Sequence, residues 1–287
     1  MLGACAAERP SAIYYAAYEA EMRAAGHLRT DVAPVDASYT SEDLAQNFFR
    51  VALHHETDIS RVAGEDNWTP NRLSRWEGPL NYQLLGTAIT DWDRARIRAL
   101  MARVAHLTGL TVREVPKGGN FLIAVTVPGE RDTFERELHR EEPVLAGIFS
   151  IWRRSPQMFC VARTTTRRKF TGSINRALVV IGSETRGLNR EACYHEEIIQ
   201  ALGLHNDHPL VRPSIFNDDD EFALLTEHDE RLLRMLFDPR LAPGMPASEA
   251  MPIARQISSE IMNGATGVNA ARGQWSPVPH TKSKKGN

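Results

Sequence analysis

The chain has 287 residues, of which 42% are hydrophobic, which is enough to bury the core of one domain of roughly 200 residues plus extensions. Its 34 basic and 36 acidic residues leave a formal charge of −2, so no global field attracts nucleic acid or an anionic membrane surface. No run approaches the ~18 apolar residues that a membrane-spanning helix needs. The composition therefore predicts a globular protein without a nucleic-acid partner.

The first residues resemble the cleavage box of bacterial lipoproteins. Leu2-Gly3-Ala4 places small residues directly before Cys5, but the basic start and apolar run of a complete export signal are missing. We expect a truncated signal with Cys5 as a candidate lipidation site, and a chance match is the alternative. The expected location is the periplasm or the exterior of the cell, with membrane contact only through a lipid anchor at Cys5.

The predicted elements begin with a peripheral N-terminal arm. Residues 1–37 are rich in alanine and charged residues and contain a helix-compatible stretch around residues 12–25. A second helix is expected to start at the capping sequence of residues 40–43, because apolar positions at helical spacing follow it. This helix is expected to end at His55.

A compact α/β pattern follows, in which strand-like and helix-like segments alternate. In chain order we expect a strand at 80–87, a helix at 91–108, strands at 111–115 and 120–127, a helix at 130–139, strands at 158–162 and 176–182, and a helix at 190–202 that Asn189 caps. Residues 264–287 lack apolar side chains to pack and are expected to be disordered. The sequence thus predicts one α+β domain at residues 38–263, between the arm and the tail.

Two cysteines remain when Cys5 is set aside. Cys160 lies in a strand-like run, and Cys193 lies two residues before His195 in the last predicted helix. Two cysteines in an exported chain usually pair, and closing a loop of about 33 residues stabilises by ~3–4 kcal/mol in the chain-entropy model. We expect a disulfide that anchors this helix to the strand, and the alternative is two buried thiols in a cytosolic protein.

The segment from 193 to 207 looks like the metal-binding helix of a zinc protease. In such a helix two ligands stand one turn apart, a glutamate activates water, and a glycine turns the chain toward a third ligand. A register that starts at His195 fails, because it puts the apolar Ile199 in the second ligand slot. Sliding by one residue puts Glu197 in the general-base slot and Gly203 in the turn slot.

Carboxylate and amide side chains fill the three ligand slots of this second register, at Glu196, Gln200 and Asn206. Neutral amides are poor zinc ligands, whereas their oxygens suit harder cations such as calcium, magnesium or manganese. Asp207 lies one position beyond the third slot and is a displaced candidate ligand. We therefore expect no zinc, and calcium or another divalent cation is the alternative.

Two downstream segments extend the resemblance. Ser214-Ile215-Phe216 resembles the Ser-Ile-Met of the methionine turn in astacin-like and matrixin-like enzymes, with Phe216 in the methionine position, and residues 225–237 resemble the closing helix of matrixins. The chain thus resembles the metzincins, which implies a mixed twisted sheet with a motif helix and a C-terminal helix. It also resembles a bacterial family of unknown function with the signature Glu-Glu-x-x-Gln-x-x-Gly-Leu-x-Asn-Asp.

The resemblance, taken with the missing histidines, implies an exported pseudo-metallopeptidase scaffold that binds a peptide or a cell-envelope glycan. The alternative is a divergent hydrolase in which Glu197 is the general base and Glu196 or Asp207 its partner, with or without a non-zinc metal. His205 and His208 are interpreted as solvent-facing or capping residues, and metal binding by this pair is the alternative. The acidic run at 218–221 is interpreted as helix-capping charge, with a calcium contact as the sharper alternative.

Overall fold

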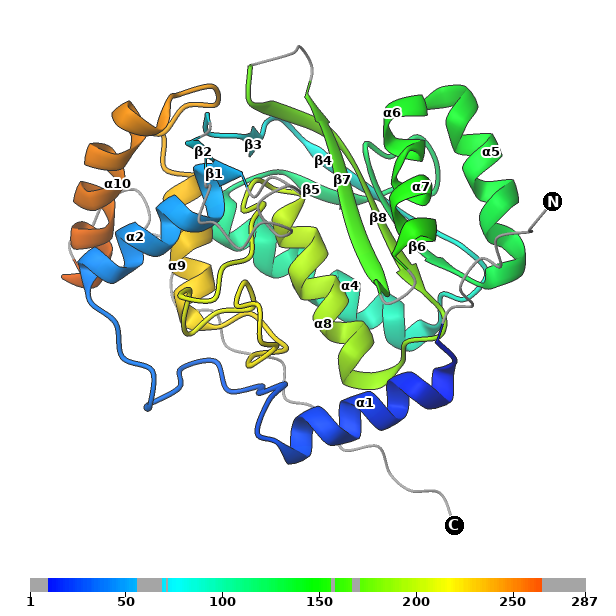
Figure 1. Cartoon of the computed structure of the whole chain (residues 1–287). Helices are drawn as coiled ribbons and strands as arrows, with labels where there is room; N and C mark the ends of the chain where they lie inside the picture. The colour runs from blue at the N-terminus through cyan, green and yellow to red at the C-terminus, as the bar shows by residue number, and fades with distance from the viewer. Residues whose placement is uncertain (1–9, 56–68, 71, 156–157, 167–170, 265–287) are drawn as a thin grey trace.

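The computed structural model of the chain describes residues 10–55, 69–70, 72–155, 158–166 and 171–264 (Figure 1). Within these ranges the chain forms a six-stranded sheet in the order β3-β8-β6-β4-β5, with β7 also paired to β8. The strands are β3 (Arg75–Trp76), β4 (Leu80–Leu85), β5 (Val112–Glu114), β6 (Phe121–Thr126), β7 (Cys160–Thr166) and β8 (Ser173–Gly182). All neighbouring strands are parallel except β7, which runs antiparallel to β8.

The central strands β6 and β8 are nearly continuous apolar runs, as expected for parallel strands that are covered on both faces. Their register pairs Phe121 with Ala177 and Thr126 with Gly182. Alternate residues of β6 face opposite sides, so Ile123 belongs to one hydrophobic cluster and Ala124 to another. The sheet therefore has a core on each face.

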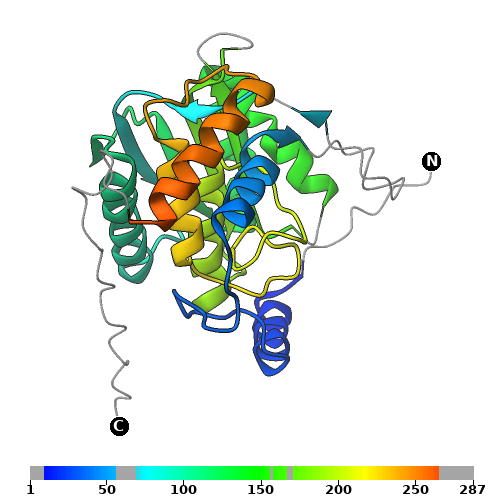
Figure 2. The same ribbon diagram turned by 90° about the vertical axis from the view of Figure 1, so that its left-hand side faces the viewer.

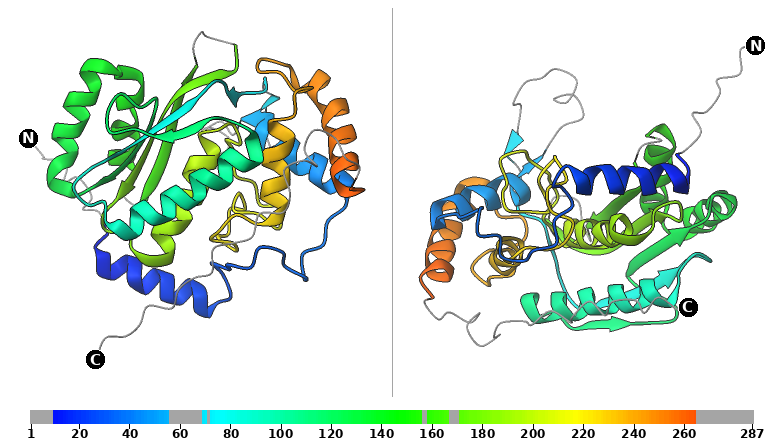
Figure 3. Two further views of the ribbon diagram at one scale, coloured as in Figure 1. Left: turned by 180° about the vertical axis from the view of Figure 1, so that it is seen from behind. Right: turned by 90° about the horizontal axis from the view of Figure 1, so that it is seen from below.

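Helices cover both faces of the sheet. The helices are α1 (Ala12–Ala24), α2 (Ser41–Ala52), α4 (Asp91–Thr108), α5 (Arg131–Glu141), α6 (Pro143–Ala146), α7 (Ile148–Arg154), α8 (Gly187–Gln200), α9 (Glu227–Leu236) and α10 (Ala247–Met262), with a short 3₁₀ turn η1 (Pro128–Glu130) before α5. The larger core joins α2, α4, α8, α9 and α10 to one face, and the smaller joins α5, α6 and α7 to the other. Figure 2 shows α2, α9 and α10 packed together, and Figure 3 shows α4 alongside α8.

Most predicted segments are found, and the expected mixed sheet with helices is confirmed. Because helices separate the parallel strands along the chain, the architecture is mixed α/β. The expected end of the second helix was wrong, since α2 ends at Ala52 and His54–His55 form a short strand β1 that pairs with β2 (Thr69–Pro70). Helices α6, α7 and α10 were not predicted.

The predicted cap of the motif helix was also wrong. Helix α8 begins at Gly187, three residues earlier than expected, and Arg186 occupies the N-cap position without a side-chain cap. The Asn189 side chain instead donates to the Tyr15 carbonyl of α1, and its backbone N–H donates to Glu19, also on α1. The Glu19 carboxylate, 170 residues earlier in the sequence, thus accepts a backbone hydrogen bond from the first turn of this helix.

Some predictions fall outside the described residues, namely those for Cys5 and for residues 265–287 of the expected tail. In the part that is described, no helix is both long and apolar enough to cross a bilayer.

Candidate functional site

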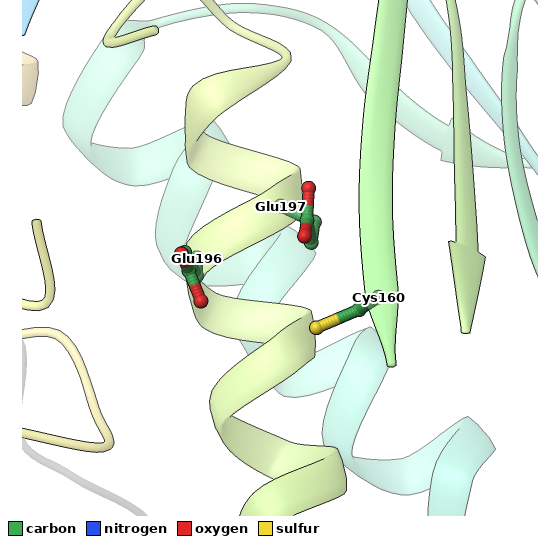
Figure 4. A group of neighbouring side chains, drawn as sticks. All are labelled: Cys160, Glu196 and Glu197. Carbon is green, nitrogen blue, oxygen red and sulfur yellow. The ribbon is translucent and has the colours of Figure 1, made fainter. Parts of the chain in front are cut away.

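Helix α8 carries the predicted motif and lies beside the edge strand β7 (Figure 4). Its apolar side chains Cys193, Ile198 and Ile199 are fully buried in the larger core. Glu196 and Glu197 follow one another in its last turns, so their side chains leave the helix in different directions. This places Glu197 toward β7 and Glu196 toward the loop that follows α8 (Figure 4).

A disulfide between Cys160 and Cys193 joins β7 to α8, with 5.9 Å between the two Cα atoms. The prediction of a bridge that anchors the motif helix to a strand is confirmed. Because Cys193 lies one helical turn before Glu197, the covalent link fixes the distance between the strand and the acidic residues.

Glu197 is buried, with 6% of its surface exposed, and its carboxyl accepts a hydrogen bond from the Ala162 backbone N–H of β7. Burial raises the pKa of Glu197 to about 8, and the neighbouring charge of Asp207 adds to the effect. The pKa of Glu196 is also raised well above its usual range, by burial and then by Asp207 and Glu197. The three carboxyl groups therefore form one coupled acidic cluster.

Gln200 completes this cluster. Its side-chain amide donates to the Asp207 carboxylate at 2.9 Å, which holds the loop aspartate against the end of α8. The structure thus brings together Glu196, Glu197, Gln200 and Asp207, four of the predicted residues.

Asn206 does not join this cluster. Its amide donates to the backbone carbonyls of Arg50, in the last turn of α2, and of His54, in β1. A buried amide with this pair of acceptors braces the loop against α2. The residue in the predicted third ligand slot therefore connects two segments of backbone.

The predicted turn residues support the loop after α8. Gly203 has φ +133, and a Cβ there would lie 2.2 Å from the Ser74 carbonyl oxygen, so a larger residue cannot take its place without a shift. The Ser214 hydroxyl donates to Asp229, which also caps α9, and the buried Phe216 donates its N–H back to Ser214. The segment resembling the methionine turn is thus tied to the closing helix.

The acidic cluster also contains the side-chain atoms that could bind a metal ion. Side-chain ligand atoms of Cys160, Glu196 and Glu197 lie within 4.8 Å of one another. The Cys160 sulfur is bonded in the disulfide and offers no thiolate, so the donor set consists of carboxylate oxygens. Carboxylate oxygens of this kind suit hard cations such as calcium or magnesium.

The other candidate ligands have partners of their own. His208 Nδ1 accepts the Leu210 N–H at 3.0 Å, which is a capping role. In the acidic run, Asp220 accepts a hydrogen bond from Tyr18 of α1, and Glu221 forms ion pairs with arginines. These contacts attach the N-terminal arm to the loop between α8 and α9.

Sequence comparison assigns residues 41–256 to the family described as protein of unknown function (DUF2927). The chain belongs to this family. No curated protein matches it. The predicted resemblance to a family of unknown function is therefore confirmed. The matched region of this DUF2927 chain runs from α2 into α10 and contains the whole acidic cluster, whereas α1 precedes it.

The DUF2927 domain also contains a buried polar network that sequence reasoning missed. The fully buried Asp93 carboxylate accepts a hydrogen bond from Tyr194 at 2.8 Å and pairs with Arg190 of α8 at 3.3 Å. Asp93 is also the third residue of the capping box that Thr90 begins. The capping box was readable from the sequence, but nothing local indicated that its carboxylate would meet a second helix.

Proposed function

We propose that this DUF2927 domain is an exported, metzincin-like scaffold that binds an extended peptide without hydrolysing it. The supporting architecture is a mixed sheet, a motif helix α8 beside an antiparallel edge strand, and the closing helix α9 after the Ser214 turn. The observation that carries the proposal is the outer edge of β7, which lies next to the acidic cluster.

The hydrogen bonding of β7 defines that edge. The Phe159 carbonyl accepts from Gly182 N–H, and the register pairs Cys160 with Ile181. Alternate residues of an antiparallel ladder bond to the partner strand, so Ala162 and Thr164 direct their backbone groups away from β8. Ala162 meets Glu197, whereas the Thr164 groups are directed outward and provide a donor and an acceptor for an added strand.

The charge next to this edge favours a basic peptide. Glu196 lies beside Asp207 and within electrostatic range of the exposed Asp218 and Asp220. Lysine or arginine side chains of a bound strand would be attracted by these acidic residues and would favour the ionised form of Glu196.

Inactivity is supported by the ligand set. The amide in the third slot, Asn206, is used for backbone bracing, and in the part of the chain that the structure describes the grouped ligand atoms belong to Cys160, Glu196 and Glu197. We expect elemental analysis of protein purified without chelator to find no stoichiometric zinc. The Cys160–Cys193 bridge supports an oxidising location such as the periplasm or the cell exterior.

Fluorescence polarisation with lysine-containing extended peptides tests the proposal. Thr164→Pro removes the outward N–H without breaking the β7–β8 ladder, and it is expected to weaken binding at least tenfold. Thr164→Ala is the matched control, because it keeps the N–H and is expected to bind normally. Equal binding by both variants would exclude β7 as the docking edge, and peptide cleavage detected by mass spectrometry would exclude an inactive scaffold.

A divergent hydrolase is the second candidate, and the pKa of about 8 at Glu197 favours it, because acid–base catalysis works best with a group that titrates near the working pH. In that case hydrolysis would increase with pH through about 8 as Glu197 loses its proton, and Glu197→Gln would abolish it while the fold remains intact.

A further inference from the structure

A second site lies at the opposite end of α8 from the acidic cluster. A cavity of about 380 Å³ opens there, and its lining residues follow the carboxyl ends of three adjacent parallel strands, namely β4, β6 and β8. The lining comprises Ala88, Thr90, Trp92, Val127, Ser183, Arg186, Gly187 and Arg190. Its volume falls in the range of about 300–1,000 Å³ that small-molecule pockets occupy.

The strand order explains why a cavity forms at this place. Strand β4 lies between β5 and β6 in the sheet. The chain leaves β4 into α4, which covers one face of the sheet, and it leaves β6 into α5, which covers the opposite face. Segments that leave neighbouring strands toward opposite faces open a crevice outside the carboxyl edge, where open α/β sheets bind their ligands. Gly86 allows the β4 loop to pass close to β6, since a Cβ there would lie 2.1 Å from the Val125 oxygen.

The cavity is basic. Arg186 is exposed at its rim and has no ion-pair partner among the described residues. The first turn of α8 adds a partial positive charge and contains no acidic residue of its own. The Glu19 carboxylate of α1 accepts a hydrogen bond from the Asn189 N–H and lies near Gly187, so it occupies one side of this helix N-terminus.

Arg190 provides a second, independent sign of a ligand. This cavity-lining arginine is only 7% exposed, and its terminal nitrogens are held by Asp93 and by the carbonyls of Ser183 and Thr185. Its Nε is buried without any hydrogen-bond partner. An unsatisfied donor on a buried cation costs about 1–3 kcal/mol, which a small side-chain shift that brings Nε to an anionic acceptor in the cavity would recover.

We propose that this cavity binds the phosphate group of a small organic phosphate, with the attached apolar group on Trp92. A guanidinium and a helix N-terminus together match the oxygens of a phosphate. Trp92 is 38% exposed at the cavity and provides the apolar surface, and Arg96 lies against its ring with 5.4 Å between the guanidinium carbon and the ring centroid. The site does not include the acidic cluster, so it stands or falls independently of the peptide proposal.

Isothermal titration calorimetry on the full chain with phenyl phosphate tests the site. We expect saturable binding with one ligand per chain, weakened about tenfold or more by Arg186→Gln. Arg113→Gln is the matched control, because Arg113 is an exposed arginine on β5, outside the cavity lining. Ser183→Asp, which adds a negative charge to the cavity wall, is expected to weaken binding at least as much.

Two further ligands separate the parts of the proposal. Inorganic phosphate is expected to bind more weakly than phenyl phosphate in the unsubstituted protein, and Trp92→Ala is expected to remove that difference. Benzoate binding as tightly as phenyl phosphate would overturn the assignment to phosphate. Absence of saturable phenyl phosphate binding at millimolar concentration, or equal affinities of the Arg186→Gln and Arg113→Gln variants, would overturn the site itself.

Discussion

The pKa of Glu197 makes the stability of the protein depend on pH in an unusual direction. The folded-state pKa is about 8, against an ordinary value of 4.5 in the unfolded chain. Between these values the unfolded chain releases its proton while the folded chain keeps it, so deprotonation favours unfolding. The contribution is fully present below about pH 4.5 and is lost as the pH rises to about 8.

The magnitude follows from the separation of the two values. Since each pKa unit corresponds to about 1.36 kcal/mol, the loss approaches roughly 4–5 kcal/mol. Glu197→Gln keeps the shape and an acceptor for the Ala162 N–H but cannot ionise. We expect the variant to differ from the unsubstituted protein by less than about 1 kcal/mol near pH 5 and to be more stable than it at pH 8 by up to roughly 4–5 kcal/mol.

Urea unfolding at pH 5, 6.5 and 8, with the disulfide intact, measures the effect. Glu141→Gln is the matched control, since Glu141 is an exposed glutamate on α5. The control is expected to follow the unsubstituted protein at every pH. If the curve for Glu197→Gln runs parallel to that of the unsubstituted protein from pH 5 to pH 8, the carboxyl is ionised in the fold and the reasoning about its burial is wrong.

Three further predictions concern the frame of the site. Replacing Cys160 and Cys193 together by serine releases a loop with a sequence separation of 33 residues and is expected to lower the unfolding free energy by about 4 kcal/mol, measured by urea unfolding against the oxidised protein. Asn206→Ala leaves two carbonyls without their donor and is expected to cost about 1–3 kcal/mol, while leaving the pH dependence assigned to Glu197 unchanged. Asp93→Asn removes the charge that faces a buried guanidinium and is expected to cost about 3–5 kcal/mol in thermal or urea unfolding, and a loss below 1 kcal/mol would show that the pair is solvated.

The sequence determined the features that depend on neighbours along the chain. Helix α4 was predicted with its observed bounds, because its apolar side chains recur at helical spacing and Gly109 ends it. The spacing of Glu196, Glu197 and Gln200 on one helix also followed from the sequence. The disulfide followed from composition and compartment, since only two cysteines remained to pair.

Only the tertiary structure decided which of these groups meet. The start of α8 was placed three residues too late because its first turn is capped by Glu19 from α1, a contact that no local pattern contains. Asn206 filled a ligand slot by spacing, yet its amide is held by carbonyls about 150 residues earlier in the chain. The basic cavity could not be predicted from the sequence either, because its lining residues come from segments far apart along the chain. It forms beside the carboxyl ends of β4, β6 and β8. These ends lie together because the three strands are neighbours in the sheet, which the order of residues in the sequence does not show.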